Sequence, residues 1–240
     1  RIAERAEGDS SRRVLDIIIT DRRGKTRERT ALVLKHNDGE QRVTRFTYLA
    51  PKSVKEVTFL SHDRLDPSES DDRWLFLPAT RKVRRIPASD RGDYFLGTDF
   101  TYEDIQSEFK LALSDYDFVL EDTQLTDDGT VYVLSGTPRS EAIARELGYG
   151  GFRARVNGSN WLFHEVEFLD LDGERLKTVT VHSAEDFDGI WCATDIEVIN
   201  HQTSHETRFV YQDVDYDTTL PARLFEATTL NRGLPPQLLP

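Results

Sequence analysis

Apolar and polar residues alternate along many stretches of this chain, so that every second residue is apolar. The pattern is clearest in four runs, which are Leu15, Ile17 and Ile19; Leu162, Val166 and Phe168; Val179 and Val181; and Cys192, Ile196 and Val198. A period of two with one apolar face is typical of a half-buried antiparallel strand. The pattern therefore predicts a mainly β protein of about ten strands, most of them paired with their neighbours in sequence.

Asp-Gly pairs mark the expected turns, because this dipeptide suits the positive φ angles of tight hairpins. Four of them stand between β-rich stretches, at residues 38–39, 128–129, 172–173 and 188–189. No shift in composition marks a domain boundary, so we expect a single domain over residues 1–240. Within it, we expect a mobile N-terminus, a mobile acidic segment at 63–72 and a mobile, proline-rich tail at 231–240.

Helices are scarce in the sequence. One candidate runs from Thr101 to Leu111, where Thr101 and Asp104 have the spacing of a capping box. The other runs from Ser140 to Leu147, with Ser140 suited to the N-cap and Gly148 to the end of the helix. Both are short, and they do not change the expected mainly β (α+β) class.

Composition and charge narrow the possible functions. Of the 240 residues, 38% are hydrophobic and 10% aromatic, which favours a globular fold over disorder. The net charge of -12 works against general binding to nucleic acid or to anionic membranes. No run approaches the ~20 apolar residues of a membrane span. No signal peptide is recognisable, and the chain contains no methionine, which either a trimmed export signal or a truncated chain would explain.

Motifs that carry catalysis are missing. The sequence has no GxSxG elbow, no HExxH pair and no phosphate-binding glycine loop between a strand and a helix. The single cysteine, Cys192, excludes an internal disulfide, and its place in an apolar strand favours inert packing. Asp213, Asp215 and Asp217 alternate along a strand, which indicates a solvated edge rather than a calcium loop. We therefore predict no enzyme activity, no metal and no cofactor.

Several segments resemble one protein family. The block RWLFLPATRKVRRIPASDRGDYFLGTDFTYEDI, residues 73–105, resembles the outer-membrane lipoprotein-sorting protein family, the LolA/LolB-like carriers of the Gram-negative periplasm. Residues 8–34 look like the opening hairpin of that family, residues 165–181 like its paired strands with Lys177 in the expected place, and residues 186–233 like its closing pattern. Residues 136–161 depart from the family pattern, because they are longer and more helical than it requires.

The resemblance implies a fold and a function. The fold would be a strongly curved antiparallel sheet that forms an incomplete barrel, with a few short helices over its concave face. The function would be that of a periplasmic carrier, its export signal removed, that binds a lipid or lipoprotein acyl chains in an apolar cavity. An inner-membrane transporter of the resistance-nodulation-division (RND) type would be its partner. The alternative is a non-catalytic adaptor of an envelope transport complex, with its cavity filled.

Two sets of residues are candidates for the site. The first set would line the cavity or, alternatively, only fill the core: Phe46, Tyr48, Phe59, Trp74, Phe76, Phe95 and Phe168. Arg81, Arg84 and Arg85 would hold a lipid head group or contact a partner. Alternatively, these cations would pair with Asp99, Glu103 and Asp104. Lys177 would be either a cation at the cavity mouth or an edge residue whose amine reaches solvent.

Overall fold

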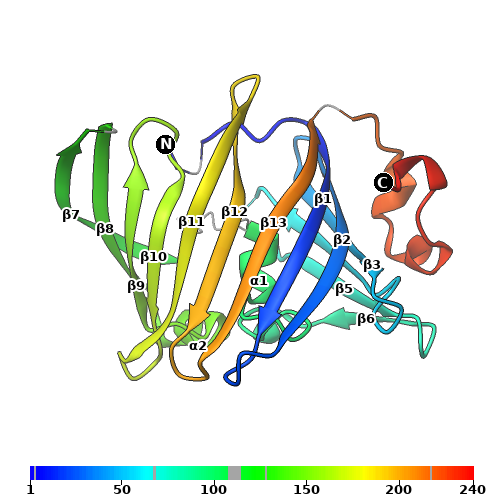
Figure 1. The fold of residues 1–240 in the computed structure, drawn as a ribbon, viewed down its shortest axis with the longest axis horizontal. Helices are drawn as coiled ribbons and strands as arrows, with labels where there is room; N and C mark the ends of the chain where they lie inside the picture. The colour runs from blue at the N-terminus through cyan, green and yellow to red at the C-terminus, as the bar shows by residue number, and fades with distance from the viewer. Residues whose placement is uncertain (3, 67–68, 108–114, 128, 217) are drawn as a thin grey trace. The chain divides into compact units, whose positions relative to one another are not determined.

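The computed structural model describes residues 1–2, 4–66, 69–107, 115–127, 129–216 and 218–240 (Figure 1). Within them lie thirteen strands: β1 (Ser10–Thr20), β2 (Thr26–Asn37), β3 (Gln41–Ala50), β4 (Thr58–Arg64), β5 (Asp72–Leu77), β6 (Lys82–Ile86), β7 (Tyr116–Thr126), β8 (Gly129–Pro138), β9 (Gly151–Asn157), β10 (Phe163–Leu169), β11 (Arg175–Phe187), β12 (Ile190–Asn200) and β13 (His205–Tyr216). The helical elements are α1 (Tyr102–Ser107), α2 (Glu141–Leu147) and the 3₁₀ turns η1 (Ala88–Asp90), η2 (Ala222–Phe225), η3 (Ala227–Arg232) and η4 (Pro236–Leu238).

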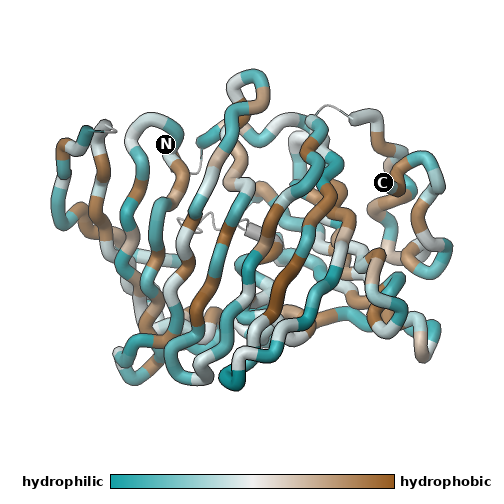
Figure 2. Tube along the Cα trace, viewed as in Figure 1, coloured by the Kyte–Doolittle hydropathy of each residue, from teal (hydrophilic) through white to brown (hydrophobic). Residues whose placement is uncertain are grey.

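The strands follow the order β6-β5-β4-β3-β2-β1-β13-β12-β11-β10-β9-β8-β7. Strands β2 to β6 pair in sequence, as do β7 to β12, and each of these pairings is antiparallel. The order begins at β6 and ends at β7, so the sheet is not closed. Apolar and polar residues alternate along the strands in Figure 2. The predicted mainly β class and sequential meander are confirmed, with thirteen strands instead of about ten.

The described chain divides into two compact units. Unit 1 consists of residues 1–6, 19–26 and 89–209, and unit 2 of residues 7–18, 27–88 and 210–240. Each unit is assembled from separate segments of the chain, so no single linker in the sequence announces the division. The expected single domain stays a prediction.

Both predicted helices are confirmed, with their caps. Asp104 accepts a hydrogen bond from the Thr101 backbone N–H (2.8 Å) and its own N–H donates to the Thr101 hydroxyl (3.1 Å), which is a reciprocal capping box. In α2 the Ser140 side chain accepts from the Ile143 N–H, and Gly148 ends the helix in the left-handed conformation. Residues 108–111 of the first candidate lie outside the described residues.

The C-terminal segment covers one face of the sheet in unit 2. An apolar cluster joins strands β1 to β5 with the 3₁₀ turns η2, η3 and η4, and contains Val14, Leu32, Leu34, Val43, Leu60, Phe76, Leu224, Phe225, Leu230 and Leu238. Polar groups of the same strands bind carbonyls of the segment. The Arg12 guanidinium donates to Leu238 O (2.9 Å), and a ring nitrogen of His62 lies 2.7 Å from Phe225 O. Leu238 anchors the tail at 231–240 to this cluster, whereas Leu239 beside it is 43% exposed, and the mobility of the tail stays a prediction.

Arg45 of β3 binds two backbone carbonyls of this C-terminal segment. Its side chain is buried, and it donates to Leu224 O (3.0 Å) and to Gly233 O (3.3 Å). Burial lowers the pKa of Arg45 to about 10, so the guanidinium remains charged at neutral pH. One buried cation thus binds both η2, at Leu224, and the residue that follows η3, Gly233.

We predict that Arg45→Met releases the C-terminal segment. Methionine keeps much of the apolar volume but removes both charged donors, which should lower the free energy of unfolding by about 2–3 kcal/mol. Amide hydrogen exchange should rise over residues 222–238. Arg84→Met, on the exposed strand β6, is the control and should leave exchange unchanged. Unchanged exchange of residues 222–238 in Arg45→Met would contradict the anchoring role.

Candidate functional site

A pocket of about 430 Å³ opens on one face of unit 1, over the three strands that end the sheet. Strands β7, β8 and β9, the loop after β9 and the N-terminal residues line it, with Arg1, Ile2, Leu120, Tyr132, Leu134, Val156 and Trp161. All of these except Arg1 are apolar or aromatic. Leu120 is 61% exposed, so part of this apolar lining is open to a ligand.

Strand register brings the lining residues together. Leu120 of β7 lies opposite Leu134 of β8, and Tyr132 of β8 lies opposite Val156 of β9. Residues directly opposite each other present their side chains on the same face, and so do residues two apart in one strand. The four side chains therefore form one apolar patch across three strands. The register of β7 shifts just after Leu120, and such a bulge redirects the following side chains.

The loop after β9 supplies an aromatic wall. Trp161 has a φ of 58°, its N–H donates to Asn157 O (2.9 Å), and its ring stacks on Tyr132 with centroids 5.4 Å apart. A Cβ on Gly158 would lie 2.9 Å from Thr130 O, so glycine is needed for the loop to approach β8. A bulky residue at positive φ is strained and persists only where its surroundings hold it. The strain at Trp161 marks this wall as a candidate functional feature.

Aromatic side chains continue the apolar face from the pocket toward β11. They are Tyr116, Phe118, Phe152, Phe168 and Tyr149, and successive rings lie 4.4–6.1 Å apart. A Cβ on Gly136 would lie 2.2 Å from the Phe152 ring, so the ring can cross β8 only because residue 136 is glycine. The cluster separates the pocket from a buried polar network.

Lys177 is the centre of that network. Its side chain has no exposure to solvent, and its Nζ donates to Asp104 Oδ2 (2.6 Å) and to the backbone oxygen of Asp99 (3.2 Å). The ammonium also lies 5.0 Å from the Tyr149 ring and 5.4 Å from the Phe168 ring. Lys177 is therefore not an edge residue whose amine reaches solvent, and its role as a cation at a cavity mouth stays a prediction. Lys177 lies in β11, opposite Phe168 of β10 and Asn200 of β12, and Asp104 of α1 supplies its counter-charge.

Burial tunes the acids around Lys177. It raises the pKa of the Asp99 carboxyl, although the Thr207 hydroxyl donates to that carboxyl (2.7 Å) and opposes the shift. Burial also raises the pKa of Tyr149 well above its usual value, so that this side chain stays a neutral phenol. The network is closed off from solvent, and it ties α1 to the sheet rather than offering a reactive group.

The predicted cavity residues do not line this pocket. Phe46, Tyr48 and Phe59 are fully buried in unit 2, and Phe95 and Phe168 are buried in unit 1. Trp74 and Phe76 of β5 lie on the opposite face of the sheet from Phe59. They face the apolar cluster that the C-terminal segment completes. These aromatics therefore contribute to packing, and their contact with a ligand stays a prediction.

The predicted basic residues remain on the surface at the sheet edge. Arg81, Arg84 and Arg85 are exposed in or beside β6, and Arg85 forms an ion pair with Asp72 of β5. The acids proposed as their partners are engaged in unit 1, since Asp104 binds Lys177 and Glu103 lies 3.9 Å from Arg91. The predicted pairing with those acids is thus not observed, and the head-group or partner role stays a prediction.

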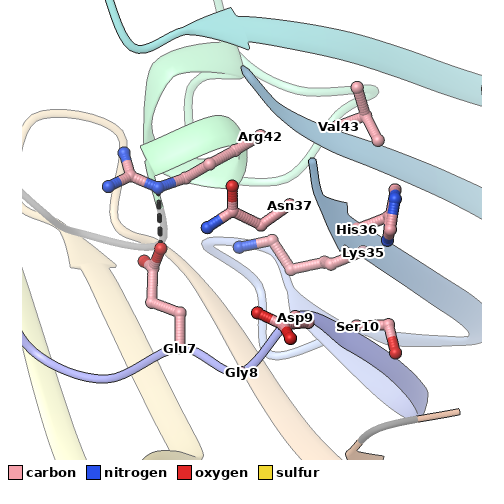
Figure 3. Close-up of a pocket in the computed structure, with 9 residues that line it drawn as sticks. All are labelled: Glu7, Gly8, Asp9, Ser10, Lys35, His36, Asn37, Arg42 and Val43. Atoms are coloured by element: carbon pink, nitrogen blue, oxygen red, sulfur yellow. Dashed lines mark ion pairs between the residues drawn. The ribbon is translucent and has the colours of Figure 1, made fainter. Parts of the chain in front are cut away.

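A second recess lies in unit 2 (Figure 3), and most of the residues that line it carry polar or charged groups. It is lined by Glu7, Gly8, Asp9, Ser10, Lys35, His36, Asn37, Arg42 and Val43, and Figure 3 shows the ion pair between Glu7 and Arg42 (2.7 Å). Its volume of about 20 Å³ suffices for one water molecule but not for a lipid. The pocket on β7, β8 and β9 is therefore the better candidate site.

Among the described residues, no His, Cys, Asp and Glu side chains gather in groups of three or more that would suit a metal ion. None of the helices in the described ranges has the length and apolar character that crossing a membrane requires.

Solved structures of several proteins are similar to this chain, and three of them cover nearly all of it. A domain described as an outer membrane lipoprotein-sorting protein, from Vibrio parahaemolyticus, is 25% identical, with a TM-score of 0.83 over 93% of this chain and 92% of that one. A DUF1329 family protein from Desulfovibrio piger is 24% identical, with a TM-score of 0.86 over 96% and 95% of the two chains. A LolA superfamily protein from Nitrosomonas europaea is 22% identical, with a TM-score of 0.68 over 94% and 93%.

One of the two sequence comparisons identifies a family. No curated protein matches the chain. A family model described as an uncharacterized protein matches residues 39–232, which is most of the sequence. The chain therefore belongs to that family, and the predicted resemblance to outer-membrane lipoprotein-sorting and LolA superfamily proteins is confirmed in the fold.

Proposed function

We propose that this protein is a periplasmic carrier that binds a lipid or lipoprotein acyl chains and passes them between envelope membranes. The observation that carries the proposal is the apolar pocket of about 430 Å³ on a LolA-like fold. The site holds no convergent set of reactive side chains, so the proposed activity is binding and release without covalent chemistry. An RND-type inner-membrane transporter is the proposed partner, by analogy with the family.

Apolar burial would supply the binding energy. Each methylene removed from water contributes about 0.8 kcal/mol, so one acyl chain could bind strongly without specific polar contacts. Release would require a partner that offers the chain a better environment, because a binding equilibrium shifts only by a difference in affinity. Helix α1, which is bound to the sheet by Lys177, would keep the ligand away from the rest of this face while the pocket is occupied.

An adaptor role is the alternative, and one observation favours it. On β7, which ends the strand order, Val119 is 60% exposed and Leu125 is 87% exposed. Exposed apolar residues on an edge strand suit docking of another protein. In that case the pocket would serve contact with a partner rather than transport of a ligand.

Native mass spectrometry of the purified protein, followed by organic extraction, tests the proposal. A carrier should retain lipid that extraction removes, and the stripped protein should quench or enhance a fluorescent fatty acid on binding. Unfolded protein serves as the control for non-specific adsorption. An adaptor should carry no lipid and should not bind the probe at micromolar concentration.

A further inference from the structure

Strand β6 is an open edge of the sheet (Figure 1). It ends the strand order and pairs on one side only, with β5. In an antiparallel pair, every second residue of an edge strand points its N–H and C=O away from the neighbouring strand. Within the described ranges, no other segment is hydrogen-bonded to the backbone of β6. These backbone groups can therefore pair with one more strand.

Four cations stand in five consecutive residues at this edge, in a protein with a net charge of -12. All four side chains are exposed. Arg85 forms an ion pair with Asp72 of β5. Among the described residues, the other three, Arg81, Lys82 and Arg84, form no ion pair. The edge therefore presents an excess of positive charge that the rest of the protein leaves uncompensated.

The cations lie on both sides of the strand. Lys82 and Arg84 are two residues apart in the ladder between β5 and β6, so they project from one face of the sheet. Arg85, the next residue, projects from the other face. A flat anionic membrane surface would meet only one of these faces at a time. A strand laid along the edge has side chains on both faces and can contact both sets of cations.

A second copy of this chain does not suit the edge. Pairing of two β6 strands would place cations opposite cations, and like charges directly opposite each other destabilise a strand pair. Carboxylates on the incoming strand would remove this repulsion and accept hydrogen bonds from the guanidinium groups. Charge therefore favours an acidic strand as the occupant.

We propose that β6 binds an acidic, extended segment of a partner protein by strand addition. Backbone hydrogen bonds along β6 hold the segment, and its carboxylates pair with Arg81, Lys82 and Arg84. Val83, which is 38% exposed and projects from the opposite face to Lys82, offers an apolar contact. The proposal goes beyond the proposed carrier function, because strand addition at β6 requires no lipid.

The probe is a synthetic peptide of about seven residues, a typical strand length, that alternates glutamate with valine and threonine. The peptide should bind the full chain, and its affinity should fall as salt is added. Amide exchange over residues 82–86 should become slower, because backbone groups of β6 become hydrogen-bonded. Absence of binding, or binding without slower exchange at β6, would overturn the proposal.

Two control peptides separate the backbone contribution from the charge. In one, lysine replaces glutamate, so the peptide can pair as a strand but is repelled by the cations. In the other, the glutamates remain and proline replaces valine and threonine, which removes the N–H donors that a ladder needs. Both should bind at least about tenfold more weakly than the probe. Equal binding of the proline peptide would show charge attraction without strand addition, and equal binding of the lysine peptide would show that the cations do not select.

Charge reversal tests the cations directly. The triple variant Arg81→Glu/Lys82→Glu/Arg84→Glu should weaken binding of the acidic peptide about 10- to 100-fold, because each substitution replaces an attraction with a repulsion. The edge stays charged in this variant, so its protection against self-pairing is retained. Circular dichroism and urea unfolding check that the variant is folded. Unchanged peptide binding by the folded variant would overturn the proposal.

The matched control is Arg22→Glu/Arg23→Glu/Lys25→Glu, in the exposed turn between β1 and β2. It changes the net charge by the same amount and should bind the acidic peptide like the unaltered protein. Equal losses in the two triple variants would mean that net charge, rather than β6, governs binding, which would contradict the proposal. Displacement of the peptide by vesicles of phosphatidylglycerol would assign the cations to a membrane surface instead.

Discussion

Replacement of Lys177 by methionine is expected to lower the free energy of unfolding by about 3–5 kcal/mol. Lys177 and Asp104 are both buried, and their charges lie 2.6 Å apart. Removing the cation leaves the Asp104 carboxylate without its counter-charge in a region of low dielectric, and the Asp99 carbonyl loses a donor. A loss of this size is a large fraction of the 5–15 kcal/mol that typically separates folded from unfolded protein. Urea unfolding, followed by tryptophan fluorescence, measures it.

Two further variants make this prediction specific. In the double variant Lys177→Met/Asp104→Asn the buried charge is gone, while the amide oxygen of asparagine still accepts from the Thr101 N–H at the start of α1. It should recover part of the lost stability. Lys82→Met, in the exposed strand β6, should change stability by less than about 0.5 kcal/mol. A double variant less stable than Lys177→Met would argue against an uncompensated carboxylate as the cause.

Leu120→Asp is expected to weaken lipid binding by about 100-fold. The leucine would contribute roughly 1.5–3 kcal/mol of apolar burial to the complex, and the new carboxylate would lose hydration when hydrocarbon covers it. Because Leu120 is largely exposed without ligand, the substitution should leave folding nearly unchanged. Binding is measured by displacement of a fluorescent fatty acid, and folding by circular dichroism and urea unfolding.

Val119→Asp is a closely matched control for this experiment. Val119 is the preceding residue on the same edge strand and has nearly the same exposure, 60% against 61%, but its side chain points to the opposite face. It should bind lipid like the unaltered protein. Equal losses in the two variants would mean that the strand edge, rather than the pocket, mediates binding. No loss in either would remove Leu120 from the site.

These experiments also separate the carrier from the adaptor. For an adaptor that docks through the exposed residues of β7, both Val119→Asp and Leu120→Asp should impair association with the transport complex, because both side chains are largely exposed. For a carrier only Leu120→Asp should have an effect, and that effect appears in lipid binding by the isolated protein. Loss of association in Val119→Asp would thus indicate partner docking rather than lipid binding.

The amino-acid sequence by itself determined the local structure. Period-two alternation predicted the strands, and the capping residues Thr101, Asp104 and Ser140 predicted both helices, because these signals act between residues close in the chain. The amino-acid sequence of residues 73–105 and of the later segments was sufficient to predict a LolA-like fold. Residues 136–161, which depart from the family pattern, supply two of the seven residues that line the pocket, Val156 and Trp161.

The tertiary structure alone decided which residues line the pocket and which are packed. Leu120, Leu134 and Val156 follow the same alternation as the core residues, so no local signal separates them from Phe46 or Phe59. The difference arises because strand register and the loop at Trp161 leave a hollow at the end of the sheet. Burial of Lys177 was equally beyond sequence reasoning, since it depends on Asp104, which lies 73 residues away in the chain. Contacts between distant segments have no period in the sequence, and only the folded chain brings them together.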